Sequence, residues 1–307
     1  MDIVDPPPSF SEYVLGLVQP AVLLAWSFKH YAVVVSETIF LRGQILAPIF
    51  RSRQVRDEAF GRFWINFSVA RDEKGTPIVD KDVPDPSTLR GSSALIPDIL
   101  SKARGVVLDV GPGSGTQMPY FADLATKEKA STIYGAEPCV GLHTELRQRI
   151  LANGLDSKYH ILSAAADKTQ LVDALRREGV QFNDEGIFDT IVCIRVLCSV
   201  PNPAQTISDL YSLLQPGGQM LIVEHVINPF SLFGNRKGGN FLARVMQTVY
   251  TMLGWRFFIG DCDLLRDTET YLRNAAERDG GWKSFDLETR FTWSTLPYIS
   301  GVLVKRN

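Results

Sequence analysis

The stretch Gly105-Val106-Val107-Leu108-Asp109-Val110-Gly111-Pro112-Gly113-Ser114-Gly115 decides the fold of this chain. Its first half is a short run of mostly aliphatic residues, which is typical of a buried parallel strand. Its second half holds three glycines within five residues, and glycine lets the backbone turn sharply and approach a ligand closely. A buried strand that runs directly into such a turn predicts a ligand-binding loop at the carboxyl edge of an open α/β sheet.

The segments after this loop alternate between strand and helix patterns. We expect strands at residues 106–110, 132–137, 159–163, 190–195 and 220–225, and helices at residues 95–102, 118–126, 142–152, 170–178 and 204–214. Strands that alternate with helices pair in parallel through right-handed crossovers. Two final apolar runs, at residues 285–293 and 298–305, leave no room for a helix between them and predict an antiparallel hairpin at one edge. The sequence therefore predicts a seven-stranded, doubly wound, Rossmann-like α/β sheet.

Composition divides the chain into an apolar part at residues 1–70, a polar connector with several prolines at residues 71–94, and the α/β domain at residues 95–307. The formal net charge of −2 supplies no basic field for phosphate groups, which argues against a nucleic-acid partner. The four cysteines include no C-x-x-C pair, which indicates a reducing compartment. We therefore expect a cytoplasmic protein.

The apolar N-terminal part has two interpretations. Residues 13–28 are nearly all apolar, but Gln19 and Pro20 interrupt them, so the run falls short of the roughly 20 apolar residues of a spanning helix. A second apolar run, at residues 31–50, is followed by three arginines within six residues. The part is either a pair of helices that pack on the α/β domain as a lid, or a hairpin that lies in a membrane interface. Residues 13–50 are the candidate for a peripheral membrane contact.

Several acidic groups near the glycine loop are candidate ligands of a nucleoside cofactor. Glu137 ends the second strand, where a carboxylate can accept hydrogen bonds from both hydroxyls of a ribose. NAD sites use the same contact, but a dinucleotide loop carries glycine or alanine where Thr116 stands. Asp167 follows the third strand, where it could accept from an adenine amine or cap the next helix. The expected cofactor-binding residues are Asp109, Gly111, Gly113, Gly115, Glu137, Asp167 and Arg195.

Further motifs carry a resemblance to a known family. They are Val196-Leu197-Cys198-Ser199-Val200, Pro216-Gly217-Gly218, Glu224-His225-Val226, Gly260-Asp261-Cys262 and Pro297-Tyr298-Ile299-Ser300-Gly301. Over about residues 57–305 the chain resembles the animal methyltransferase-like thiol methyltransferases, which are membrane-associated class I enzymes that act on small lipophilic thiols. The resemblance implies S-adenosyl-L-methionine as the cofactor, with Asp109 and the loop around its methionine part. Pro112 and Ser114 depart from the family pattern, and the N-terminal part matches in character only.

The resemblance makes residues 95–307 a methyltransferase domain with an aromatic-rich insertion at residues 228–282 on the acceptor side. An apolar roof predicts a lipophilic acceptor, and the expected substrate-binding residues are Trp255, Phe258 and Asp261. No sequence feature recognises a thiol, so we expect methyl transfer to an oxygen of a small, lipophilic, secondary-metabolite-like molecule. Transfer to a thiol, and use of the fold for a non-methylating reaction, are the alternatives. Thr116 disfavours a nicotinamide dehydrogenase.

Methyl transfer is an in-line displacement, so the protein aligns the acceptor and removes its proton where needed. His225 ends the fifth strand, and because histidine has an ordinary pKa near 6.5 it is the expected general base. A histidine hydrogen-bonded at the end of the sheet is the alternative. Cys198 is expected to be a buried packing residue. Since the histidines are scattered and the cysteines are not clustered, no metal site is expected.

Overall fold

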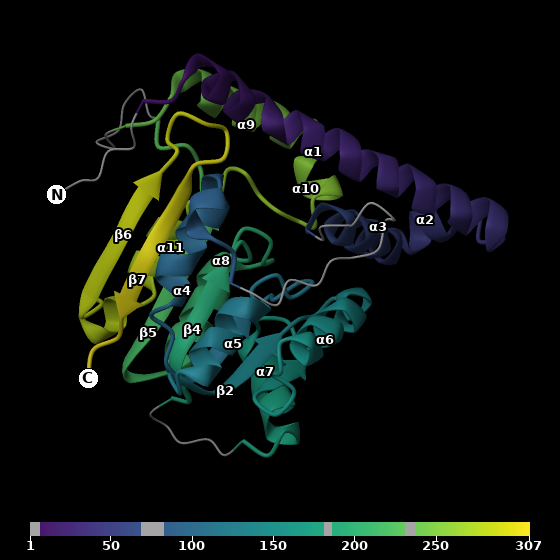
Figure 1. The fold of residues 1–307 in the computed structure, drawn as a ribbon. Coiled ribbons are helices and arrows are strands. Elements are labelled where there is room, and N and C mark those ends of the chain that lie inside the picture. The colour runs from purple at the N-terminus through teal and green to yellow at the C-terminus, as the bar shows by residue number, and fades with distance from the viewer. Residues whose placement is uncertain (1–6, 69–82, 181–185, 231–237) are drawn as a thin grey trace.

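The computed structural model describes residues 7–68, 83–180, 186–230 and 238–307. Figure 1 shows a twisted sheet with helices on both faces and a long helix across one end. The sheet has seven strands in the order β3-β2-β1-β4-β5-β7-β6. Strand order reverses between β1 and β4, and open α/β sheets bind ligands at such a point. The predicted doubly wound sheet is confirmed.

The strands follow the expected segments closely, with one difference in β5. They are β1 (Gly105–Val110), β2 (Ala130–Ala136), β3 (Tyr159–Leu162), β4 (Phe188–Ile194), β5 (Leu214–His225), β6 (Ser284–Arg290) and β7 (Tyr298–Val304). β5 begins at Leu214 instead of residue 220, because the Pro216-Gly217-Gly218 turn lies inside the strand, with Gly217 at φ +72°. The C-terminal hairpin is confirmed: β7 pairs antiparallel with both β5 and β6.

Two separate apolar cores lie on the two faces of the sheet. In β4, Ile191 and Cys193 face one core while Val192 and Ile194 face the other, as the two-residue period of a strand requires. One core is covered by α4 (Ile96–Leu100), α5 (Met118–Thr126) and α6 (His143–Ala152), and the other by α7 (Lys168–Arg177), α8 (Pro203–Leu213) and α11 (Thr268–Asn274). The sheet is therefore buried on both faces.

Short turns connect these elements. They are η2 (Pro86–Thr88), η3 (Gly91–Leu95), η4 (Val140–Leu142) and η5 (Glu277–Asp279). The connector expected at residues 71–94 lies partly outside the described residues, because the description resumes at residue 83. Its described part holds η2 and most of η3 and leads into α4.

The N-terminal part forms a long helix, α1 (Phe10–Ser36), which continues through the π-helical turn η1 (Glu37–Leu41). The chain then returns through α2 (Ala47–Phe50) and α3 (Ser52–Ser68). α1 packs against α3 and against two helices of the insertion, α9 (Phe241–Met252) and α10 (Trp255–Phe258). The N-terminal helices therefore contact the acceptor-side insertion.

Gln19 and Pro20 interrupt the apolar run in the sequence, but α1 continues through Pro20. Proline has no backbone N–H to donate to the carbonyl four residues earlier, which here belongs to Gly16. The Gly16 carbonyl accepts instead from the Thr295 hydroxyl at 2.7 Å and from the Thr295 backbone N–H at 3.2 Å. A tertiary contact thus replaces the hydrogen bond that Pro20 cannot make.

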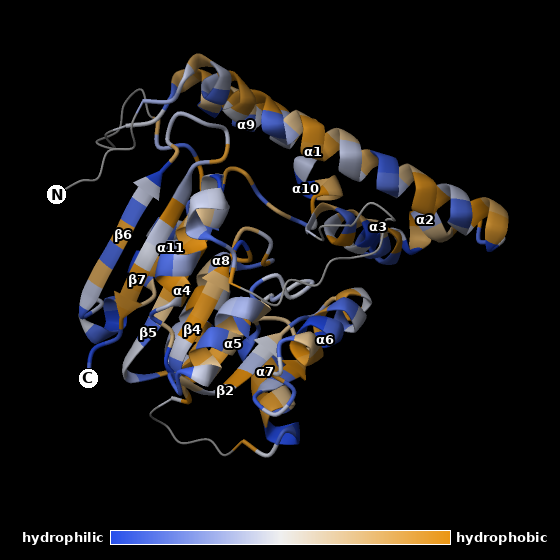
Figure 2. Cartoon of the chain, viewed as in Figure 1, coloured by the Kyte–Doolittle hydropathy of each residue, from blue (hydrophilic) through white to orange (hydrophobic). Residues whose placement is uncertain are grey.

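Much of α1 is apolar on its outer side as well, as Figure 2 shows by colour. The helix Phe10–Leu41 is long and apolar enough to cross a membrane, by length and composition only. Of its most apolar 18-residue window, 17% is buried within the structure. The core helix of a globular domain is mostly buried, so α1 leaves an unusually large apolar surface uncovered.

Candidate active site

The glycine loop after β1 adopts a backbone conformation that glycine favours. Gly111, Gly113 and Gly115 have φ values of +65°, +60° and +82°, where side chains on other residues would be strained. A Cβ atom at Gly111 would lie 2.5 Å from a side-chain carbon of Val196, in the segment after β4. These three expected cofactor-binding residues therefore lie together at the point where the strand order reverses.

Asp109 is buried at the end of β1, directly before this loop. Its Oδ2 atom accepts a hydrogen bond of 2.8 Å from the Tyr159 hydroxyl. Burial raises the pKa of Asp109 to about 7, although the Tyr159 hydrogen bond opposes that rise. Tyr159 was not anticipated. Its signal in the sequence is Gly135 near the end of β2, because a Cβ atom there would collide with the Tyr159 ring.

Glu137 connects the end of β2 to the glycine loop. Its Oε2 atom accepts from the Gly113 backbone N–H at 2.9 Å, and its Oε1 atom accepts from the Cys139 N–H at 2.8 Å. Burial raises the pKa of Glu137, and these two hydrogen bonds oppose the rise. The structure therefore brings Asp109, Glu137 and the loop together as expected, while the ribose contact stays a prediction.

The other two expected cofactor residues have partners within the protein. Asp167 caps α7 by accepting from the Gln170 backbone N–H at 3.0 Å, which is the alternative that the sequence left open. The Arg195 guanidinium donates to the hydroxyls of Ser92 and Ser93 at 2.8 and 2.9 Å. Arg195 is thus directed toward η3. A contact of Asp167 or Arg195 with the cofactor stays a prediction.

Helix α3 covers the glycine loop from the N-terminal side. A Cβ atom at Gly113 would lie 3.0 Å from Nε1 of Trp64, and the hydroxyls of Ser68 and Ser114 lie 2.8 Å apart. The Trp64 ring stacks on Phe60 with 5.8 Å between ring centroids. Neither Trp64 nor Ser68 was named from the sequence, because their place over the loop depends on how α3 packs.

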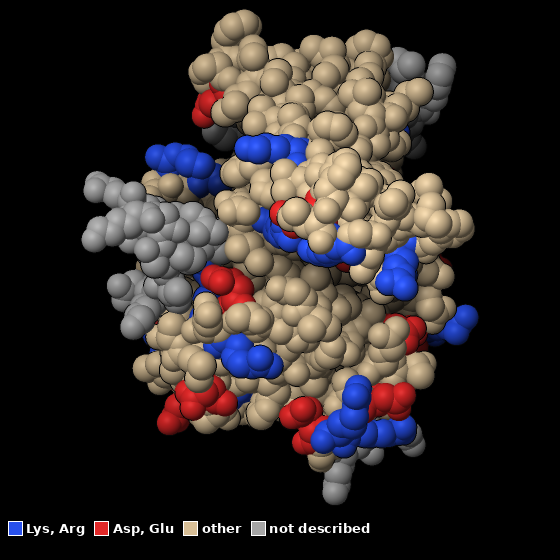
Figure 3. Space-filling model, turned by 90° about the vertical axis from the view of Figure 1, so that its right-hand side faces the viewer, with Lys and Arg blue, Asp and Glu red and all other residues tan. Residues whose placement is uncertain are grey.

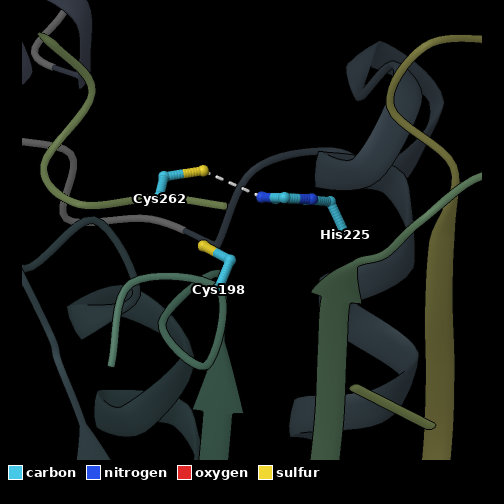
Figure 4. A group of neighbouring side chains, drawn as sticks. All are labelled: Cys198, His225 and Cys262. Carbon is cyan, nitrogen blue, oxygen red and sulfur yellow. Dashed lines mark hydrogen bonds between the residues drawn. The ribbon is translucent and has the colours of Figure 1, made fainter. Parts of the chain in front are cut away.

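At the carboxyl ends of β4 and β5, three buried side chains converge (Figure 4). One polar atom of each side chain lies within 4.8 Å of the other two. These atoms are Sγ of Cys198, Nε2 of His225 and Sγ of Cys262. His225 Nε2 lies 2.9 Å from Cys262 Sγ. The expectation that the cysteines are unclustered is therefore wrong, because residues far apart in the sequence meet here.

The side chains of this cluster are buried. A hydrogen bond with Cys262 and burial together raise the pKa of the Cys198 thiol well above its ordinary value. Trp255 donates from Nε1 to Cys262 Sγ at 3.2 Å. The other ring nitrogen of His225, Nδ1, is buried and has no hydrogen-bond partner among the described residues. A general-base role for His225 stays a prediction.

Glu224, beside His225, was not singled out from the sequence as a site residue. Its Oε1 atom accepts from the backbone N–H groups of Val196 and Leu197 at 2.8 and 2.9 Å. Arg266 donates from the opposite side to the carbonyls of Leu197 and Val200. These contacts fix the segment after β4, which carries Cys198.

The three expected substrate-binding residues lie in different surroundings. Trp255 lies beside the cluster, whereas Phe258 packs edge-on against Phe28 and Tyr31 of α1. Asp261 forms an ion pair with Arg56 of α3. Phe258 and Asp261 thus hold the insertion against the N-terminal helices. Contact of any of the three with the acceptor stays a prediction.

Comparison with known proteins places this chain in a family. Residues 89–255 match the family described as methyltransferase domain. The chain is similar to thiol S-methyltransferase TMT1B of Homo sapiens, with 32% identity over 91 residues, which cover 30% of this chain and 33% of that protein. It is also similar to phosphatidylethanolamine N-methyltransferase of Cereibacter sphaeroides, with 26% identity over 129 residues, 39% of this chain and 51% of that protein.

A solved O-methyltransferase family protein from Burkholderia thailandensis superposes with a TM-score of 0.46 at 14% identity, covering 95% of this chain and 71% of that one. The chain spans about half or less of the length of the two curated relatives. The family match itself covers more than half of the chain. The chain therefore belongs to the methyltransferase domain family.

Proposed function

We propose that this enzyme transfers the methyl group of S-adenosylmethionine to the sulfur of a small lipophilic thiol. The observation that carries the choice of sulfur is the position of His225, whose Nε2 atom lies 2.9 Å from Cys262 Sγ instead of being free. An ordinary thiol has a pKa of about 8.5 and loses its proton readily. A hydroxyl acceptor depends on a base more than a thiol does, and the contact with Cys262 makes His225 less accessible as a base.

The residues around the glycine loop fit the cofactor. When bound, S-adenosylmethionine supplies an activated methyl group on a positively charged sulfonium. The buried carboxyl groups of Asp109 and Glu137 lie beside the loop and can pair with a cationic group and with ribose hydroxyls. The loop itself has no side chain at three positions, which lets a ligand approach its backbone closely.

The names of the relatives support sulfur as well. Three of the four curated relatives are thiol S-methyltransferases, from human and rat. Oxygen methylation, which the sequence favoured, is the competing proposal. The aromatic insertion and the apolar N-terminal helices support a lipophilic acceptor in either case.

A pair of matched acceptors separates sulfur from oxygen. The purified enzyme is incubated with S-adenosylmethionine and either an aryl or alkyl thiol or the alcohol or phenol of the same skeleton. We expect a thioether from the thiol, together with S-adenosylhomocysteine, both measured by mass spectrometry. Methylation of the hydroxyl compounds alone would overturn the assignment to sulfur.

His225 is the residue whose loss should separate binding from turnover. We expect His225→Ala to bind S-adenosylhomocysteine as tightly as the wild type and to lose most of its turnover. Calorimetry measures the first property and product formation the second. Turnover like that of the wild type would remove His225 from the mechanism.

We also propose that the N-terminal helices attach the enzyme peripherally to a membrane. Six large apolar residues form an apolar tip, and each is 59 to 81% exposed. The apolar tip consists of Phe40, Leu41, Ile45, Leu46, Ile49 and Phe50. Figure 3 faces this end of the molecule and shows uncharged surface, with Lys and Arg side chains and some Asp and Glu side chains around it. Such an arrangement suits an interface in which apolar groups enter the lipid and cations meet headgroups.

Vesicle flotation tests this attachment. We expect the wild type to float with vesicles that contain phosphatidylserine and to be released by alkaline carbonate, as a peripheral protein is. The double variant Phe40→Asp with Phe50→Asp should stay in solution, while Leu151→Asp, at an exposed apolar position on α6, should behave as the wild type. Retention of the wild type after carbonate would instead favour a spanning helix.

A further inference from the structure

We propose that Cys198, His225 and Cys262 form a zinc-binding site with one coordination position left open. The two Sγ atoms and the Nε2 atom lie within 4.8 Å of one another and come from three separate segments of the chain. Figure 4 shows the side chains pointing toward one common centre. This is the spacing that ligands of a single metal ion require.

The chemistry of the three ligands favours zinc. Thiolate and imidazole ligands suit Zn²⁺, which is usually four-coordinate and tetrahedral. Two cysteines with one histidine make a ligand set typical of catalytic zinc, in which a fourth position is kept for water or substrate. Binding would displace the two thiol protons to solvent, so the charges of the two thiolates and the metal ion cancel in this buried place.

Neighbouring groups hold the ligands in position. Trp255 donates to Cys262 Sγ, and an N–H group that donates to a ligand atom helps to orient it. Asp263 donates from its backbone to the Cys198 carbonyl at 3.0 Å. The His225 ring packs edge-on against Tyr298, its partner in the β5–β7 register. The site is therefore supported by the sheet and by the insertion together.

The open position gives the site a role that rests on the proposed thiol methylation. An acceptor thiol that binds zinc loses its proton to solvent and stays as a thiolate. Its sulfur then forms a bond to the methyl carbon as the bond from that carbon to the sulfonium breaks, and S-adenosylhomocysteine leaves. His225 serves as a metal ligand in this scheme, in place of a general base.

Metal analysis of the full-length enzyme tests the site directly. The protein is prepared without a histidine tag, reduced, equilibrated with zinc and freed of excess metal. Inductively coupled plasma mass spectrometry should then find a single zinc ion per chain. We expect Cys198→Ser and Cys262→Ser to lose it and Cys193→Ser, a buried cysteine on β4 outside the cluster, to keep it. Trp255→Phe should weaken zinc binding about tenfold.

Further measurements keep loss of folding apart from loss of ligands. Each variant is checked for S-adenosylhomocysteine binding, and cobalt substitution should give a thiolate charge-transfer absorption that Cys198→Ser and Cys262→Ser reduce. A reduced wild type that takes up no zinc would overturn the site, and so would folded cysteine variants that retain it. A protein that binds zinc but methylates no thiol would leave the site standing and refute the proposed function.

Discussion

Thr295 supplies to the Gly16 carbonyl the hydrogen bond that Pro20 cannot donate. This contact joins the long N-terminal helix to the loop between β6 and β7. We expect Thr295→Val to lower the free energy of unfolding by about 1 kcal/mol, because it removes one buried hydrogen bond. In a Pro20→Ala background the cost should be smaller, since the new backbone N–H can donate to Gly16. Urea unfolding of the wild type, the two single variants and the double variant measures the coupling between Thr295 and Pro20. An equal loss of stability from Thr295→Val in both backgrounds would show that Thr295 does not replace the missing hydrogen bond.

The raised pKa of Asp109 makes stability depend on pH. The carboxyl group ionises near its ordinary pKa of 3.8 in the unfolded chain and at about 7 in the folded one. Between these values the folded state holds more protons, so this contribution to stability is complete below pH 4 and is lost as pH rises through 7. Each unit of difference between the two pKa values corresponds to about 1.4 kcal/mol. The free energy of unfolding therefore falls by on the order of 4 kcal/mol over this pH range.

Asp109→Asn should remove this dependence. We expect the variant to be more stable than the wild type near pH 8 and to differ little from it near pH 4. Urea unfolding at several pH values measures the difference between the two proteins. A constant difference over the whole range would show that Asp109 is not the titrating group.

Glu137 holds the glycine loop, and we predict that it also binds the ribose of the cofactor. We expect Glu137→Ala to raise the dissociation constant of S-adenosylhomocysteine by about tenfold or more, as the loss of charge-assisted hydrogen bonds would. Isothermal titration calorimetry measures this dissociation constant. Glu269→Ala, on the opposite face at α11, is the control and should bind as the wild type does. An unchanged affinity of Glu137→Ala would refute the ribose assignment.

Trp64 of α3 lies against the glycine loop, so we predict that it contributes to cofactor binding. We expect Trp64→Ala to weaken S-adenosylhomocysteine binding severalfold, because Nε1 of Trp64 lies against Gly113 of the loop. Ile65→Ala, in the same helix but beside Lys29 and His30 of α1, is the matched control. If both variants bind equally well, α3 plays no part in holding the cofactor.

Local sequence patterns were sufficient to predict the sheet, its parallel order and the glycine loop, because each depends on residues close together in the chain. The loop could be recognised from Gly111, Gly113 and Gly115 because they directly follow a buried strand. The hydrogen bond from Tyr159 to Asp109 could not be predicted, because it crosses an intervening strand. The same holds for Pro20, whose effect on α1 is cancelled by a residue near the other end of the chain.

Some site residues could likewise be placed from local sequence patterns, whereas others depend on tertiary packing. Asp109 and Glu137 follow their strands directly, so the topology brings them to the loop. Cys198, His225 and Cys262 come from three segments whose meeting depends on how the insertion folds back over β4 and β5. Asp167 could be located from the sequence, but its role could not be decided. An acidic residue at this position can either cap a helix or contact a ligand, and the sequence pattern is the same in both cases.

The place of β7 in the sheet also affects how the enzyme forms. β7 lies between β5 and β6, so β5, which ends in His225, has an unpaired side until β7 has been synthesised. A nascent chain that has already made β1 to β5 exposes an apolar edge strand, and such edges pair readily with other chains. Protection of this edge, and with it completion of the site around His225, is therefore a late event in biosynthesis.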